Sequence, residues 1–95
     1  MKVTIHTILT LKRIIGARKL DVDLADEASV EDLLSLMKKR WGEELSSHLF
    51  NPQSGCLIPH VRIMVNGRQI EFLNGIDTPL TDGDEVLILP LVAGG

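Results

Sequence analysis

The sequence has little cysteine and no long run of basic residues, and each of these absences argues against a class of protein. Its single cysteine, Cys56, cannot form an internal disulfide. Thirteen Asp and Glu outnumber ten Lys and Arg, which gives a net charge of −3, and the longest basic run is Lys38-Lys39-Arg40. A protein that follows a phosphate backbone needs a longer basic stretch. We therefore expect neither a disulfide framework nor a nucleic-acid partner.

Membrane-directed and nucleotide-binding segments are also missing. The first residues include no apolar stretch that resembles a signal peptide or a membrane span. The pattern Gly-x-x-x-x-Gly-Lys-Ser/Thr, whose backbone would cradle phosphates, does not occur. We predict a cytoplasmic chain that contacts no membrane and binds no cofactor by itself.

Metal ligands and nucleophiles are sparse. Cys56 is followed by His60 and preceded by His48, but these residues do not have a recognisable zinc spacing. Nothing nearby in the sequence marks the Cys56 thiol as reactive. His6 fits a surface position on a strand. We expect no metal site.

The composition that remains is that of an ordinary folded domain. Apolar residues make up 44% of the 95 residues and charged residues 24%. A chain of this size can bury a single core, so we predict one domain over residues 1–95.

The first part of the chain reads as two strands and a helix. Apolar and polar residues alternate over Lys2–Lys12 and again over Arg18–Leu24, with a turn at Arg13–Ala17 between them. Ser29 can cap a helix whose apolar residues repeat at helical spacing from Val30 to Trp41. Gly42 is expected to end this helix.

The second part begins with the irregular segment 43–60, which we expect to be a loop. Alternation returns at Val61–Val65, and Asn66-Gly67 is a strong hairpin signal before a short strand at Gln69–Phe72. A last strand is predicted at Glu85–Pro90.

This order predicts an α+β fold of the β-grasp, or ubiquitin-like, type. It is a mixed sheet of four to five strands covered on one face by one helix. In that layout the first and last strands pair in parallel at the centre of the sheet. The last strand would then be anchored in the core, and residues 91–95 would continue from it as a flexible tail.

The tail, Leu91-Val92-Ala93-Gly94-Gly95, suits entry into a narrow site. Glycine has no β-carbon, so a partner's walls can close on the backbone. Fully extended, the tail spans about 17 Å. The alternative is a frayed terminus without a role.

A second surface is needed to hold such a tail in a partner. If Val61, Ile63 and Val65 face the helix, period two sends the intervening residues and alternate residues of the last strand to the opposite face of the sheet. These residues form a predicted partner-binding patch: Arg62, Met64, Leu87 and Leu89. The alternative is that a loop or a second copy covers them.

Three segments of the chain carry a family resemblance: Val65-Asn66-Gly67-Arg68, Leu80-Thr81-Asp82-Gly83-Asp84-Glu85-Val86 and Pro90-Leu91-Val92-Ala93-Gly94-Gly95. Together they resemble the MoaD/ThiS group of sulfur carriers, and most closely the MoaD type, the small subunit of molybdopterin synthase. MoaD chains often carry a further proline where this chain has Leu91, and the segment 43–60 looks longer than in shorter carriers.

The resemblance implies that the chain is not catalytic alone. An E1-like adenylating enzyme of the MoeB/ThiF type would use ATP to activate the carboxylate of Gly95. A sulfur donor protein would then provide sulfur to displace AMP and leave a thiocarboxylate. The molybdopterin synthase large subunit, of the MoaE type, would use that sulfur.

Other functions stay open. A ubiquitin-like modifier would pass the activated Gly95 to a substrate lysine. A ThiS-like carrier would serve thiamin thiazole synthesis, and a tungsten-type cofactor would replace the molybdenum one. A plain interaction domain would use the sheet patch without needing Gly95.

Overall fold

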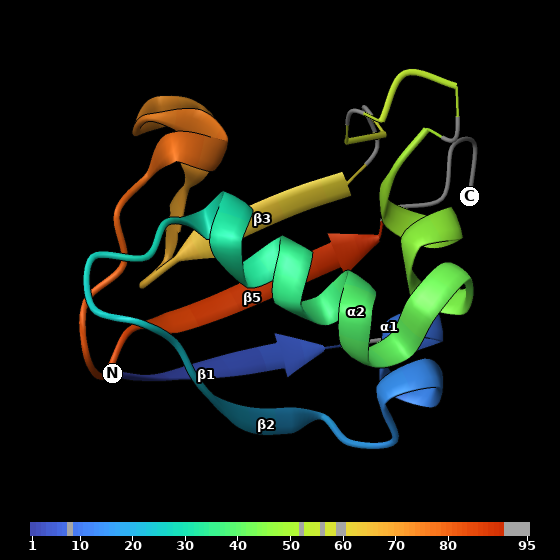
Figure 1. Ribbon diagram of the computed structural model, residues 1–95, viewed down its shortest axis with the longest axis horizontal. Coiled ribbons are helices and arrows are strands. Elements are labelled where there is room, and N and C mark those ends of the chain that lie inside the picture. The colour runs from blue at the N-terminus through green and yellow to red at the C-terminus, as the bar shows by residue number, and fades with distance from the viewer. Residues whose placement is uncertain (8, 52, 56, 59–60, 91–95) are drawn as a thin grey trace.

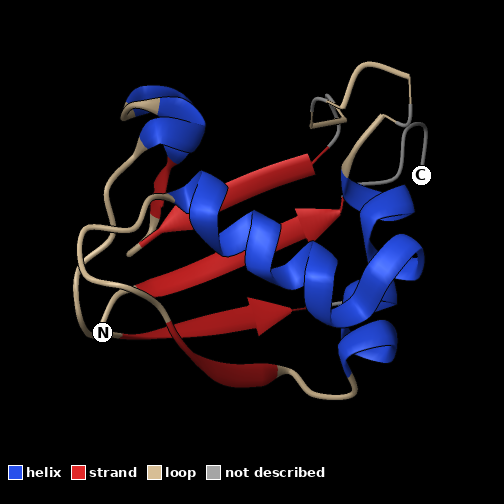
Figure 2. Cartoon of the chain, in the orientation of Figure 1, coloured by secondary structure: helices blue, strands red, loops and turns tan. Residues whose placement is uncertain are grey.

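The computed structural model describes residues 1–7, 9–51, 53–55, 57–58 and 61–90. A five-stranded mixed sheet runs in the order β2-β1-β5-β3-β4, and the long helix α2 lies across one face of it (Figures 1 and 2). The elements are β1 (Lys2–Thr7), α1 (Leu9–Ile15), β2 (Lys19–Asp23), α2 (Val30–Leu49), β3 (Val61–Val65), β4 (Arg68–Gln69), two 3₁₀ turns η1 (Ile70–Phe72) and η2 (Gly75–Asp77), and β5 (Glu85–Pro90). This confirms the predicted β-grasp fold.

Strand β5 is held on both edges. It pairs in parallel with β1, with Thr4 opposite Glu85 and Thr7 opposite Ile88. On its other edge it pairs antiparallel with β3 from Val65, opposite Val86, to Val61, opposite Pro90. The expected central parallel pair is therefore confirmed, and the backbone up to Pro90 belongs to the middle of the sheet.

The core lies between the sheet and α2. Val3 and Ile5 of β1, Ile63 of β3 and Ile88 of β5 alternate inward and are buried. Apolar residues of α2, including Leu33 and Met37, are fully buried against them. Truncating a buried Leu, Ile or Met to alanine typically costs about 2–5 kcal/mol, so these residues hold the helix on the sheet. The predicted inward set from β3 and β5 is confirmed.

The predicted first strand, Lys2–Lys12, is too long. The strand ends at Thr7, and the helix α1 occupies part of the expected strand and turn. Leu11 in α1 is fully buried, and α1 packs against α2. Alternation alone could not show this, because Leu11, Ile14 and Ile15 also fit helical spacing. The chain returns as β2, antiparallel to β1 as expected.

The helix was predicted to end at Gly42, and that end is wrong. Gly42 does break the helical geometry, with φ 67° and ψ −151°, but a second helical stretch continues to Leu49. Leu45 and Leu49 lie four residues apart and are both buried. Part of the predicted loop 43–60 is therefore helix, and burial of this apolar pair stabilises it.

The predicted helix start is confirmed. Ser29 caps α2 in a capping box, in which the Ser29 amide donates to Asp32 Oδ2 at 2.8 Å and the Asp32 amide donates to Ser29 Oγ at 3.3 Å. These two bonds satisfy donors that a helix end would otherwise leave unpaired.

The predicted short strand Gln69–Phe72 is only partly correct. The hairpin at Asn66-Gly67 is confirmed by positive φ values of 51° and 84° at these residues, as a type I′ turn requires. Strand β4 ends at Gln69, however, and the chain turns into η1. This turn buries Ile70 in the core and leaves Phe72 outside.

Candidate functional site

The start of β5 is fixed by a network around Asp84. Thr81 donates to Asp84 from its amide at 2.8 Å and from its hydroxyl at 2.9 Å. Asn66 Nδ2 donates to Asp84 Oδ1 at 2.9 Å, and the amide of Glu85 donates to Asn66 Oδ1 at 3.0 Å. These bonds join the hairpin turn to the loop that precedes β5, so they connect two of the segments that carry the family resemblance.

The protonation of Asp84 follows from these contacts. Burial by itself would raise the pKa of Asp84, but the hydrogen bonds from Asn66 and Thr81 outweigh burial and lower the pKa below its ordinary value. Asp84 is therefore an ionised, structural acceptor. Sequence reasoning singled out its segment but did not reveal its contact with Asn66.

The structure brings together the four residues of the predicted patch. On β3 and β5, Arg62 lies opposite Leu89 and Met64 lies opposite Leu87. All four are partly buried and alternate with core residues, so they share the sheet face away from α2. Arg62 also lies 3.5 Å from Glu71 in an exposed ion pair, which typically contributes less than about 1 kcal/mol.

A pair formed by a histidine and a glutamate extends this face. His6 lies beside Leu87 in the parallel register, and its Nε2 is 2.8 Å from Glu85 Oε1. The prediction placed His6 on the strand surface but did not include it in the patch. The alternation of β1 together with a parallel β1–β5 pair could have placed it there.

The tail residues Leu91, Val92, Ala93, Gly94 and Gly95 lie outside the described residues. The last described residue of β5 is Pro90, which pairs with Val61. Proline has no amide proton, so it cannot donate a ladder hydrogen bond. Gly95 is five residues beyond this point, within about 17 Å of chain.

Other kinds of site find little support in the part of the chain that is described. There, no group of three or more His, Cys, Asp or Glu side chains could hold a metal ion. Cys56 and His60 fall outside that part, so the group that they would form with His48 stays untested. No described helix has the length and apolar character needed to cross a membrane.

Comparison with solved structures places this architecture among small ubiquitin-like proteins. SAMP1 from Haloferax volcanii superposes with a TM-score of 0.84 at 25% identity over the whole of both chains. A putative molybdopterin converting factor subunit 1 from Pyrococcus furiosus gives 0.76 at 28% identity, covering 97% of this chain and 99% of the other. CysO in a complex with BexX from Amycolatopsis orientalis gives 0.73 at 26% identity, covering 98% and 99%.

Curated relatives are similar over much of the sequence. Small archaeal modifier protein 3 from Haloferax volcanii is 32% identical over 95 residues, all of both chains. A putative sulfur carrier protein from Archaeoglobus fulgidus is 38% identical over 76 residues, 80% of this chain and 83% of the other. CysO from Mycobacterium tuberculosis is 46% identical over 52 residues, 54% and 56% of the two chains.

The β-grasp sheet, with its central β5 leading to the Gly-Gly segment, defines the class of ubiquitin-like sulfur carriers and modifiers. The chain belongs to the ThiS family, whose model matches residues 10–95. Members of this class are not catalytic alone, as the sequence suggested.

Proposed function

We propose that this chain is a sulfur carrier that works through the carboxylate of Gly95. A partner of the E1-like adenylating class joins this carboxylate to AMP from ATP and releases pyrophosphate. A sulfur nucleophile at the sulfide level, supplied by a donor protein, then attacks the acyl carbon, displaces AMP and leaves a thiocarboxylate. The single observation that carries the proposal is the pairing of β5 with β1 up to Ile88 and with β3 up to Pro90, only five residues before Gly95.

The chemistry of the carboxylate decides which step belongs to the partner and which to this chain. A carboxylate is ionised at neutral pH and is a poor electrophile, so it needs activation before sulfur can be attached. The chain has no phosphate-binding loop. ATP is therefore bound by the partner, and this chain contributes the reacting carboxylate and a surface for docking.

The docking surface in this proposal is the patch formed by Arg62, Met64, Leu87 and Leu89. Ordering a five-residue tail costs roughly 1–2 kcal/mol per residue. Burial of roughly 300 Å² of apolar surface contributes about 7 kcal/mol at 25 cal/mol per Å². A patch of this size can thus offset most of the ordering cost.

For the fate of the sulfur, we propose molybdopterin formation with a large synthase subunit of the MoaE type. The putative molybdopterin converting factor among the structural neighbours supports this choice. The second candidate is conjugation of Gly95 to lysines of other proteins, supported by the full-length similarity to a small archaeal modifier protein. Both functions use the same activation step.

Intact-mass measurement tests the shared step. The chain is co-expressed with the activating enzyme and sulfur source of its own organism, and a mass increase equal to the exchange of one oxygen for sulfur is expected. A chain with one residue added after Gly95 should show no increase, whereas Lys39→Ala, an exposed change on α2, should behave like the parent. An unmodified parent chain would contradict the proposal.

Proteomics then separates the two fates. Arg68 is the last Lys or Arg of the chain, so trypsin leaves residues 69–95 on any lysine that is joined to Gly95. The modifier function is indicated by such adducts on other proteins. Their absence, together with conversion of a pterin precursor by the thiocarboxylated chain and its large subunit, indicates the carrier function. A thiocarboxylated chain that transfers sulfur to neither pterin nor protein would leave the thiamin thiazole route as the candidate.

A further inference from the structure

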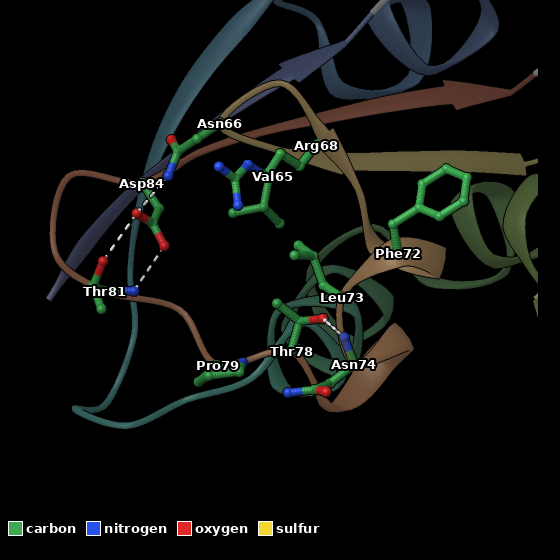
Figure 3. Close-up of a pocket in the computed structure, with 10 residues that line it drawn as sticks. All are labelled: Val65, Asn66, Arg68, Phe72, Leu73, Asn74, Thr78, Pro79, Thr81 and Asp84. Carbon is green, nitrogen blue, oxygen red and sulfur yellow. Dashed lines mark hydrogen bonds between the residues drawn. The ribbon is translucent and has the colours of Figure 1, made fainter.

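A groove of about 730 Å³ lies at the opposite end of β5 from the tail. It is bounded by the β3–β4 hairpin, the η1–η2 segment and the loop before β5 (Figure 3). Figure 3 shows Arg68 and Phe72 along one side and Thr78, Pro79 and Thr81 along the other. Asp84 lines the groove just before β5, about 20 Å of extended strand away from Pro90.

Phe72 gives this groove an exposed aromatic wall. Its side chain is 81% exposed, whereas Ile70, two residues earlier, is 6% exposed. Only one other large apolar side chain in the described part of the chain is exposed, Ile76 at 40%, and it belongs to the adjacent turn η2. Aromatic rings at such positions supply much of the binding energy in protein interfaces.

Arg68 gives the same groove an available positive charge. It is exposed, and the described residues include no ion pair for it. The one carboxylate that lines the groove belongs to Asp84, whose two oxygens accept bonds from Asn66 and Thr81. The groove thus offers a guanidinium without an ion pair to any described residue, at the end near Asp84, and an exposed ring at the opposite end (Figure 3), although the chain as a whole carries a net charge of −3.

We propose that this groove binds an acidic, partly apolar segment of a partner protein. A carboxylate of that segment pairs with the guanidinium of Arg68, which can accept it in bidentate geometry. A neighbouring apolar side chain of the segment packs on Phe72. The guanidinium of Arg68 favours this occupant over a basic one, because the Asp84 carboxylate already accepts hydrogen bonds from Asn66 and Thr81.

The groove is separate from both the predicted docking patch and the tail. The predicted docking patch lies on the face away from α2, and the tail follows Pro90. A partner in the groove would therefore hold the domain while Gly95 is engaged elsewhere. This inference goes beyond the proposed function, since it does not depend on what chemistry Gly95 undergoes.

Selection from a displayed library of random dodecapeptides against the full chain tests the proposal. Enriched peptides should contain Asp or Glu within a few residues of an aromatic or aliphatic side chain. An enriched peptide added to the isotope-labelled chain should shift the amide resonances of Arg68, Phe72 and Thr78, and those of Met64 and Leu87 far less.

Matched variants make the test specific. Arg68→Glu and Phe72→Ser should each weaken binding of the enriched peptide at least tenfold, and Arg68→Lys should retain most of it. Lys39→Glu makes the same charge change at an exposed position on α2 and should leave binding unchanged. Removal of Gly94 and Gly95 should also leave it unchanged, which separates this site from the tail.

Five results would overturn the proposal, and four of them concern the peptides. In the selection, either no peptide is enriched or the enriched peptides are basic. In the binding measurements, neither Arg68→Glu nor Phe72→Ser weakens binding, or the resonance shifts are centred on the opposite sheet face. Concentration-dependent shifts of the groove residues in the free chain would assign the groove to a second copy instead, and would also overturn it.

Discussion

At the level of single residues, Asp84 shows how one carboxylate can fix the start of the central strand. Its oxygens join Thr81 and Asn66, and Asn66 in turn accepts the amide of Glu85 at the first position of β5. The arrangement keeps the strand in register from its start. Register matters here because a slip of one residue would move every side chain of β5 to the other face.

Replacement of Asp84 by Asn should therefore destabilise the fold by about 1–3 kcal/mol at pH 7. The new amide would bring two donors to a position where the carboxylate only accepts. Because the pKa of Asp84 is lowered in the folded state, its stabilising effect is complete above the ordinary carboxyl pKa and is lost as pH falls through the lowered value. Urea unfolding should show a difference between parent and variant that shrinks below about pH 4, where ordinary Asp side chains become protonated.

The matched control for this experiment is Asp77→Asn, which changes an exposed carboxylate in η2. We expect this variant to have the same free energy of unfolding as the parent at pH 7 and below about pH 4. An Asp84→Asn protein as stable as the parent at pH 7 would show that the network does not hold β5.

Among the helices and strands, α2 is distinctive because it has two parts that are separated at Gly42. The first part packs Leu33 and Met37 on the sheet, and the second packs Leu45 and Leu49. The backbone at Gly42, with φ 67° and ψ −151°, belongs to a region that is populated almost only by glycine. The break redirects the helix so that both parts reach the core.

Gly42→Ala should cost about 1–3 kcal/mol in the free energy of unfolding, because alanine is strained in this conformation. A β-carbon there would meet no atom within 4 Å, so the effect comes from the backbone alone. Thermal and urea unfolding would measure it. Glu43→Ala, at the next and exposed position, should change stability little. A Gly42→Ala protein that is more stable than the parent would mean that a straight helix fits the core equally well.

Across the whole molecule, the two ends of β5 have different surroundings. Asp84 and the groove lie before its first residue, and the tail continues beyond Pro90, with the patch on the sheet between them. β5 itself is paired on both edges, which fixes its position relative to both neighbouring strands. A rigid central strand suits the proposed function, in which the domain presents its terminus in a defined direction to an activating enzyme.

If the patch docks the activating enzyme, Leu87→Asp should raise the KM of adenylation roughly ten- to hundredfold. Burial of a Leu side chain contributes about 1.5–3 kcal/mol, and each 1.4 kcal/mol is a factor of about ten. ATP–pyrophosphate exchange with the partner enzyme measures this. Ser35→Asp introduces the same negative charge on the exposed side of α2 and should leave KM unchanged. Equal KM values for all three proteins would remove the patch from the docking surface.

Sequence patterns were sufficient for the elements whose signals are local and strong. The Ser29 cap, the Asn66-Gly67 turn and the alternation of β3 and β5 each specify a conformation within a few residues. Together they predicted the β-grasp order and the inward and outward faces of the sheet. The resemblance at Gly94-Gly95 and at the segment 80–86 indicated the family. None of these inferences required contacts between distant residues.

Tertiary packing was needed wherever local signals compete or end. Leu11 fits a strand and a helix equally, and its burial, together with the packing of α1 against α2, selects the helix. Leu45 and Leu49 extend α2 past a glycine because their burial in the core stabilises the second helical stretch. The contact of Asn66 with Asp84, and the groove beside Phe72, arise from segments that meet only after folding. Pairing across such distances depends on the whole core, which no short stretch of sequence encodes.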